Sequence, residues 1–443
     1  MRHNSYFLLF LLTLFPITLS AQKKLFIPDT LRTINLNDTS SQWCWQRSAQ
    51  TDNLIFFWEK GFGDDLLNPP PLEGKPMKFD LANLEERVES FYHYFRDTLQ
   101  FTLPGSKADR YKMMVMIMYS LDGTAYGGTY DNFIGALWVA PNRIQDRKFN
   151  CLAHELGHSF QLQIPADSVG EAWGGSGFFE MTSQWMLWQV NPDWVKDEQY
   201  HFDAFRQLTH KAYLHMENIY HSPYVIQWWS ELRGKTSIAE LYRNGKIGED
   251  PVITYKRLYH LSQSEFCDEL FRGYQHLVNF DFQHAYQETR PYACTFNTRM
   301  NAMGKNNEYL MPASSNCPEN YGFNAIPLTV PKQGKKVSVE FSGMPDAEGY
   351  ISVNPEKAGW RYGFVGVTVD GKSVYGETHS AIKGKAVFRA PKDRPLKNLY
   401  LVVMGAPTEH WKNPMGWGEK RKADAQWPYR IKLKGATPIE VNK

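Results

Sequence analysis

The segment His154-Glu155-Leu156-Gly157-His158 limits the possible folds of this 443-residue chain more than any other stretch. Histidines four residues apart share one face of an α-helix, because four residues advance about 400° around its axis. Two imidazole nitrogens on one face can bind a single Zn²⁺. Glu155 lies beside them and can accept a proton from a zinc-bound water. The segment therefore predicts a helix that carries a hydrolytic zinc centre.

A catalytic zinc site needs a third protein ligand, and the next helix expected along the chain supplies a candidate. Glu180 stands between large apolar residues in the sequence Phe178-Phe179-Glu180-Met181. An ionised carboxylate in such surroundings requires a partner, and zinc would be one. Glu171, at the start of a glycine-rich break at 170–177, is an alternative ligand, and Asp167 is another. Glu180 is preferred because of its apolar neighbours.

The order of these residues resembles a known group of enzymes. His154, Glu155 and His158, followed on the next helix by Glu180, resemble the gluzincin metallopeptidases. The stretch 134–190 also resembles a secreted bacterial gluzincin-type family known mainly as a domain of unknown function, and more distantly the enhancin-like, mucin-acting metallopeptidases. The resemblance implies that the two histidines and Glu180 bind Zn²⁺ and that Glu155 is the general base.

Three further positions bear on this resemblance. The metzincin pattern H-E-x-x-H-x-x-G-x-x-H is disfavoured, because Gln161 and Ile164 stand at its glycine and third-histidine positions. Many gluzincins carry an aspartate four residues after the ligand glutamate, where this chain has Gln184. A glutamine can accept a hydrogen bond from an imidazole N–H but lacks the charge, which lowers the basicity of the ligand. The resemblance also implies that the strand 134–139 is the edge strand that pairs with an extended substrate.

A peptidase also needs a group that stabilises the oxyanion. Tyr220, His221 and Tyr224 follow the second helix and are candidates for this role. Packing or a surface position is the ordinary role of such residues, so the choice among the three stays open.

The chain before about residue 295 indicates a mixed sheet followed by a mostly helical part. Short apolar runs indicate strands, and apolar residues at helical spacing indicate helices. The expected strands are 53–58, 111–119 and 134–139, the expected helices are 80–99, 146–163, 178–190, 225–232 and 266–277, and 123–128 is expected to be a glycine-bearing turn.

Beyond about residue 326 the pattern changes to short β-type runs separated by turns. Asp370-Gly371 is a hairpin signal between two of these runs, and their regular spacing predicts an antiparallel β-sandwich. The stretch 295–325 is irregular and rich in Asn, Ser, Pro and Gly, so we expect a boundary there. The expected fold class is thus α+β, with a domain over 22–320 that by the resemblance is gluzincin-like and a β-sandwich over 326–443.

The N-terminus has the pattern of a secretory signal peptide. A basic start is followed by an apolar run and by Leu19-Ser20-Ala21, which offers small residues at a cleavage site. Residues 1–21 are therefore expected to be removed, and the mature protein is expected to be secreted or periplasmic. No later stretch is apolar enough to suggest a membrane span.

Charge and cysteine content exclude some classes of partner and site. The formal charge is +2, from 49 basic and 47 acidic residues, which gives no field that would attract nucleic acid or an anionic membrane. None of the five cysteines stands in a C-x-x-C pair, so a cysteine zinc site is not expected. Cys294 and Cys317 could form a disulfide in an oxidising compartment.

The leading hypothesis is a secreted zinc-dependent endopeptidase that acts on a peptide, protein or glycoprotein. The runner-up is a glycan- or glycoprotein-binding protein whose zinc site is structural or weakly active, which the aromatic content and the C-terminal β-region suggest. Zinc-dependent hydrolysis of a non-peptide substrate is a third reading, because the motif indicates metal chemistry rather than the bond cleaved. Glu155 favours the enzyme, since a purely structural site has no need of a base.

Overall fold

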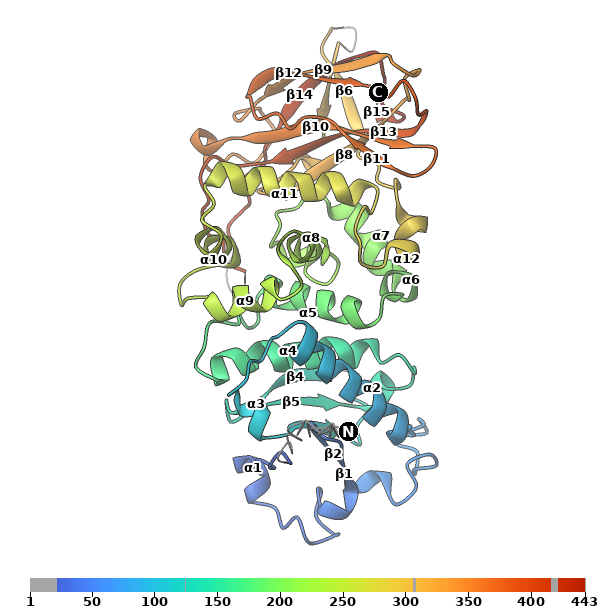
Figure 1. Ribbon diagram of the computed structural model, residues 1–443, viewed down its shortest axis with the longest axis vertical. Helices are drawn as coiled ribbons and strands as arrows, with labels where there is room; N and C mark the ends of the chain where they lie inside the picture. Colours follow the sequence, from blue (N-terminus) through green and yellow to red (C-terminus); the bar gives the residue numbers. More distant parts are fainter. Residues whose placement is uncertain (1–21, 124, 306–307, 416–420, 443) are drawn as a thin grey trace, which may run out of the picture.

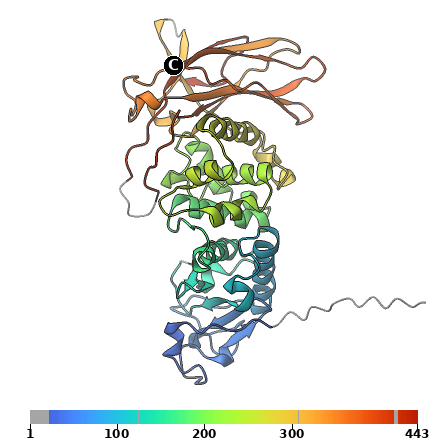
Figure 2. The same cartoon turned by 60° about the vertical axis from the view of Figure 1, so that its left-hand side comes forward.

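The computed structural model describes residues 22–442 apart from 124, 306–307 and 416–420, so the expected signal peptide lies outside the described residues. The architecture is mixed α+β with several sheets. Three tiers stack along the long axis: an N-terminal sheet, a helical tier, and a tier of two further sheets (Figure 1). The tiers remain stacked in the second view (Figure 2). Within the described residues, no helix has both the length and the apolar character that crossing a bilayer requires.

The N-terminal sheet has five strands in the order β1-β2-β3-β5-β4. β2 (Leu54–Trp58) and β3 (Met113–Ile117) are entirely buried, as is usual for central parallel strands covered on both faces. β3 also runs parallel to β5 (Ile134–Val139), whereas β1 (Ser48–Gln50) and β4 (Ala125–Tyr130) pair antiparallel with their neighbours. The expected strands at 53–58, 111–119 and 134–139 are therefore confirmed.

Two expectations about this sheet are wrong. Most of the stretch 123–128 is strand rather than turn, since it forms the first part of β4. The edge strand is also β4 and not β5, because β5 lies between β3 and β4 in the sheet. The sequence of β4, Ala-Tyr-Gly-Gly-Thr-Tyr, contains two glycines, which are depleted in strands, but the segment pairs with β5 and is held as a strand.

Two helices connect the sheet tier to the helical tier. α4 (Asn150–Ala166) begins four residues later than expected, because Asp146 Oδ1 accepts hydrogen bonds from the backbone N–H groups of Lys148 and Phe149 and closes a turn there. Phe149 then takes a left-handed conformation with φ of 54° just before the helix. α5 (Gly177–Val190) begins where expected, and the Ser176 side chain caps it by accepting from a backbone N–H.

α4 is buried on nearly all sides, because it packs against β4 and β5 on one face and α5 on the other. The expected helix at 80–99 is α2 (Leu81–His93), which continues as a π-helical turn over 94–98. The other helices are α1 (Asp29–Arg32), α3 (Lys107–Arg110), α6 (Trp194–Asp197), α7 (Gln199–Leu208), α8 (Tyr224–Arg233), α9 (Ser237–Asn244), α10 (Pro251–Leu258), α11 (Gln263–Val278) and α12 (Tyr286–Thr289).

The C-terminal tier consists of two mainly antiparallel sheets with a shared apolar core. One sheet has the order β11-β10-β13-β8 and the other β12-β9-β14-β7-β6-β15. Their strands are β6 (Met300–Met303), β7 (Tyr309–Pro312), β8 (Phe323–Leu328), β9 (Lys336–Gly343), β10 (Trp360–Thr368), β11 (Ser373–Tyr375), β12 (Lys383–Arg389), β13 (Leu396–Gly405), β14 (Tyr429–Lys434) and β15 (Val441–Asn442). The irregular stretch 295–325 thus contributes β6, β7 and the start of β8.

Burial along the strands explains how this tier joins the helices. β9 alternates buried and accessible positions, which is typical of a strand with one covered face. β10 is buried throughout, because Phe364 faces the second sheet whereas Val365 and Val367 pack in the core that includes α11. The hairpin predicted at Asp370-Gly371 joins β10 to β11, with Gly371 at a φ of 83°.

All five cysteines are unpaired, so the suggested disulfide between Cys294 and Cys317 is wrong. Cys294 Sγ lies 3.6 Å from the Oδ1 atom of Asn279, at the end of α11. Cys317 is buried separately, with its Sγ atom against the Pro318 carbonyl.

Candidate metal centre

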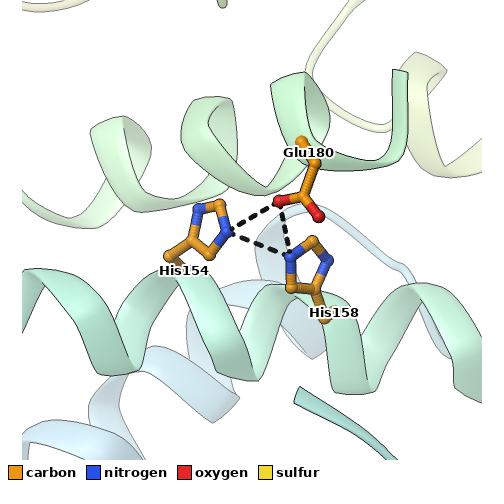
Figure 3. A group of neighbouring side chains, drawn as sticks. All are labelled: His154, His158 and Glu180. Atoms are coloured by element: carbon orange, nitrogen blue, oxygen red, sulfur yellow. Dashed lines mark hydrogen bonds and ion pairs between the residues drawn. The ribbon is translucent and has the colours of Figure 1, made fainter. Parts of the chain in front are cut away.

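α4 and α5 bring His154, His158 and Glu180 together, as expected from the sequence (Figure 3). The two histidines rise from α4 toward α5, and Glu180 points back between them. Glu180 Oε2 lies 3.2 Å from His154 Nε2 and 3.1 Å from His158 Nε2, and the two Nε2 atoms are 3.0 Å apart. Three atoms that can donate a lone pair therefore converge on one point.

Small residues at the crossing of the two helices allow this approach. A Cβ atom on Gly157 would lie 2.5 Å from the Ser183 hydroxyl oxygen on α5, so a larger side chain would force the helices apart. Ser183 donates a hydrogen bond to the His154 backbone carbonyl and ties the helices at this level. The His158 ring stacks on Phe179, with ring centroids 4.1 Å apart. The three side chains are thus held by packed helices rather than by loops.

The three side chains fit a tetrahedral metal ion with one further position. Zinc bonds of about 2.0–2.1 Å would separate ligand atoms by about 3.3–3.4 Å in a regular tetrahedron. The separations here are 3.0–3.2 Å, so a shift of a few tenths of an ångström is enough. Among the described residues Glu180 has no lysine or arginine partner, and its ion pairs are with the two histidines. Thus no lysine or arginine in the described part of the chain occupies the point where these atoms meet.

Burial and neighbouring charges shift the pKa values of His154 and Glu180 in opposite directions. The exposed fractions of His154, His158 and Glu180 are 7%, 5% and 9%. Burial disfavours the charged form of His154, but the hydrogen bond to Glu180 and the charges of Glu155 and Glu180 outweigh it and raise the pKa of His154. Burial likewise opposes ionisation of Glu180, yet hydrogen bonds from both histidines hold its pKa well below the usual range. The site therefore favours a cation, whether a proton or a metal ion.

Glu155 lies on the part of α4 that contacts the edge strand β4. Its Oε2 atom accepts a 2.7 Å hydrogen bond from the backbone N–H of Gly127. A Cβ atom on Gly127 would approach the Glu155 backbone oxygen to 1.8 Å and the His158 Cβ to 2.7 Å. Only glycine fits here, so β4 can lie directly on the helix that carries the histidines. Glu155 is half-buried and outside the ligand group.

The alternative carboxylates are engaged elsewhere. Glu171 Oε1 accepts hydrogen bonds from the backbone N–H groups of Ala172 and Trp173. Asp167 accepts from the Lys107 backbone and from the Gln163 side chain. Neither belongs to the group formed by the two histidines and Glu180.

Of the three candidate oxyanion residues, Tyr220 borders the site. Its ring centroid is 6.1 Å from that of His154, and it is 36% exposed. Burial and the charges of Glu180 and Glu155 raise the pKa of Tyr220 to about 12, so its hydroxyl stays a donor. His221 instead contacts His201, with their Nδ1 atoms 2.7 Å apart. Tyr224 is buried among aromatic side chains.

Sequence reasoning missed the roles of two residues at this site, Gln161 and Gly127. Gln161 Oε1 lies 2.8 Å from His158 Nδ1, just as Gln184 Oε1 lies 2.8 Å from His154 Nδ1. Residues three apart on a helix are neighbours, so the spacing of His158 and Gln161 was a usable signal. Gly127 could not be found in this way, because its role depends on where β4 packs.

A second group of possible ligands lies between the helical tier and the C-terminal sheets. We refer to the three residues on α4 and α5 as the helix group and to this second set as the loop group: His215, Glu319 and Asp424. Asp424 is already paired with Arg421, at 2.8 Å from its Nη2 atom. Lys211 Nζ lies 3.7 Å from Glu319 Oε1. Burial raises the pKa of Glu319 to about 7.

Comparison with known proteins identifies the family of this chain. No curated protein matches it. The M60 catalytic domain of Clostridium perfringens ZmpC, solved in complex with the sialyl T antigen, is 12% identical and covers 83% of this chain and 67% of that chain, with a TM-score of 0.32. The structure of PirA is 11% identical and covers 26% of this chain and 83% of that chain, with a TM-score of 0.14. Scores this low carry no argument about function.

The family comparison covers nearly the whole chain and agrees with the resemblance to a family of unknown function. Its match extends over residues 17–440, and the chain therefore belongs to the family of unknown function DUF6055.

Proposed function

We propose that this protein is an exported zinc metallopeptidase of gluzincin type, in which His154, His158 and Glu180 hold the metal and Glu155 is the general base. The observation that carries the proposal is the convergence of three ligand atoms, 3.0–3.2 Å apart, on the helix face next to a carboxylate that takes no part in ligation. Two histidines from one helix and a glutamate from the next is also the ligand order of the gluzincins.

The residues around the metal have separate tasks in this proposal. Zinc, when bound, would supply Lewis acidity to the attacking water and to the scissile carbonyl. Glu155 accepts the proton of the water, and the Gly127 N–H holds its carboxylate in place meanwhile. The Tyr220 hydroxyl, which burial and nearby carboxylates keep protonated, donates to the developing oxyanion.

The free edge of β4 favours a peptide over other substrates. β4 is the last strand of its sheet, and its second edge is not paired within the sheet. An extended peptide can add to such an edge through main-chain hydrogen bonds. Gly127 lies within this strand and contacts Glu155, so a chain bound there would run past the general base. We therefore propose that the substrate is an extended segment of a protein or glycoprotein.

The proposal is tested by incubating the mature protein with a proteome-derived peptide library, with and without a chelator. We expect cleavage that the chelator abolishes and that added zinc restores. Zinc binding without cleavage of any peptide would instead favour a binding protein with a structural zinc site.

Export is part of the proposal and has its own test. We propose that residues 1–21 direct the chain out of the cytoplasm, so exported material should begin near Gln22. N-terminal sequencing of that material should find this start, and a start at Met1 would contradict it.

A further inference from the structure

We propose that Gln161 and Gln184 are positioning residues that fix the tautomer of both metal-binding histidines. Each amide would keep the proton of its histidine on Nδ1 and so present the Nε2 lone pair to the metal. The inference rests on the metal-binding half of the proposed function and is independent of whether a peptide is cleaved.

The contacts of Gln184 determine which nitrogen of His154 carries the proton. Gln184 Nε2 lies 2.9 Å from the Tyr220 backbone oxygen, which can only accept a hydrogen bond. The amide NH₂ must therefore face Tyr220, and the carbonyl Oε1 faces His154 Nδ1 at 2.8 Å. An oxygen acceptor at this distance requires an N–H on Nδ1. The neutral imidazole then has its lone pair on Nε2, toward Glu180.

Gln161 does the same for His158. Its Nε2 atom donates to the Phe179 backbone oxygen at 2.9 Å and to the Tyr242 hydroxyl at 2.7 Å, which uses both amide hydrogens. Oε1 is thereby turned to His158 Nδ1 at 2.8 Å. Gln161 is 0% exposed and Gln184 4% exposed, so water cannot readily replace either acceptor.

These contacts also explain why an amide stands where many gluzincins have an aspartate. The side chain at 184 must accept from an imidazole on one side and donate to a backbone carbonyl on the other. A carboxylate could only do the first and would face the Tyr220 oxygen without a hydrogen. Gln184 therefore links the orientation of His154 to the backbone of the segment that carries Tyr220.

Gln163 offers a matched control for variants of these glutamines. It lies on the same helix as Gln161, is also 0% exposed, and makes a similar set of bonds. Its Oε1 atom accepts from the Gly135 backbone, and its Nε2 atom donates to Phe133 and Asp167, so it touches no ligand. Replacing it with methionine removes a comparable buried amide without changing a metal-binding histidine.

The test is the zinc dissociation constant, measured by competition with a chromophoric chelator. We expect Gln161→Met and Gln184→Met each to weaken zinc binding by about 10–100-fold. Gln163→Met should keep the wild-type zinc dissociation constant, although it should lower the melting temperature about as much as Gln161→Met and Gln184→Met do. Equal losses of affinity in Gln163→Met and Gln161→Met, or unchanged affinity in the first two variants, would overturn the inference.

A second measurement covers the case in which the methionine variants do not fold. Long-range ¹H–¹⁵N spectra of the zinc-loaded wild type should show both histidines protonated on Nδ1. Protonation of either on Nε2 would overturn the inference directly. Because neither measurement uses a substrate, a protein that binds zinc but cleaves nothing would refute the peptidase proposal and leave this inference standing.

Discussion

The helix group has two histidines and one carboxylate, and the loop group has one histidine and two carboxylates. In each group the possible ligand atoms lie within 4.8 Å of one another, yet the groups differ in what balances their charge. In the helix group, the only ion pairs of Glu180 among the described residues are with the two histidines that share its site. In the loop group, Arg421 already neutralises Asp424 and Lys211 lies near Glu319. Proximity of ligand-type side chains is therefore not enough to indicate a metal site. The helix group is distinguished by having no lysine or arginine partner among the residues that the structure describes.

The helix group and the loop group also differ in the structural elements that carry their side chains. The side chains of the helix group stand on two packed helices, and each of its imidazoles has a buried glutamine Oε1 atom 2.8 Å from its Nδ1 atom. The residues of the loop group come from three irregular segments that precede or follow helices and strands. A metal centre requires ligands held in place before the ion binds, and helices hold side chains more firmly than loops do. We expect zinc at the helix group and none at the loop group.

The largest effect should follow the loss of a histidine from the helix group. His154→Ala or His158→Ala leaves two protein ligands, which cannot hold zinc tightly. Elemental analysis should find about one zinc per chain in the wild type and almost none in either variant. Full zinc content in one of these variants would place the metal elsewhere, with the loop group as the first alternative. His215→Ala serves as the control and should keep its zinc.

The second prediction concerns the third ligand. Glu180→Ala should weaken zinc affinity far more than Glu171→Ala, because Glu171 is engaged by backbone N–H groups in its own loop. Titration with a competing chelator measures both variants on one scale. The reverse ranking would mean that Glu171 reaches the metal and that the geometry of α5 is not the one described.

The smallest effect is expected at the loop group and concerns stability. Burial raises the pKa of Glu319 from 4.5 to about 7, so between these values the folded protein binds its proton more tightly than the unfolded chain does. The free energy of unfolding should therefore fall as the pH rises through this window. Glu319→Gln mimics the neutral form and should raise the free energy of unfolding at pH 8 by up to about 3 kcal/mol, with little change near pH 4.5.

Urea denaturation at the two pH values tests this prediction. Zinc content should be unchanged in Glu319→Gln, because the loop group is not expected to bind the metal. A loss of zinc in this variant would show that the two groups had been ranked wrongly.

The helix group was predictable from the sequence because the features that indicate it lie within short segments. The four-residue spacing of the histidines and the apolar neighbours of Glu180 are properties of single helices, and α4 and α5 bring them together as expected. The fully buried strands β2 and β3 were also predictable from short apolar runs. Such local patterns predict structure because the buried positions of a helix or strand are apolar.

What could not be predicted depends on contacts between distant segments. The strand order that makes β4 the edge, and the approach of Gly127 to Glu155, arise from packing of residues 28 positions apart. The loop group joins segments more than 200 positions apart, from His215 to Asp424. Sequence spacing gives no signal for such contacts. It also gave no reason for Gln184, which the Tyr220 carbonyl provides.

The most direct test of the account is the comparison of wild type and Glu155→Gln in one buffer, with zinc stoichiometry and peptide cleavage rate measured on the same samples. The variant keeps the size of the side chain and leaves His154, His158 and Glu180 untouched, so zinc content and fold should be retained. Cleavage should fall by about 10²–10⁴-fold, the contribution of a positioned general base. A variant that keeps its zinc and cleaves at the wild-type rate would contradict the mechanism.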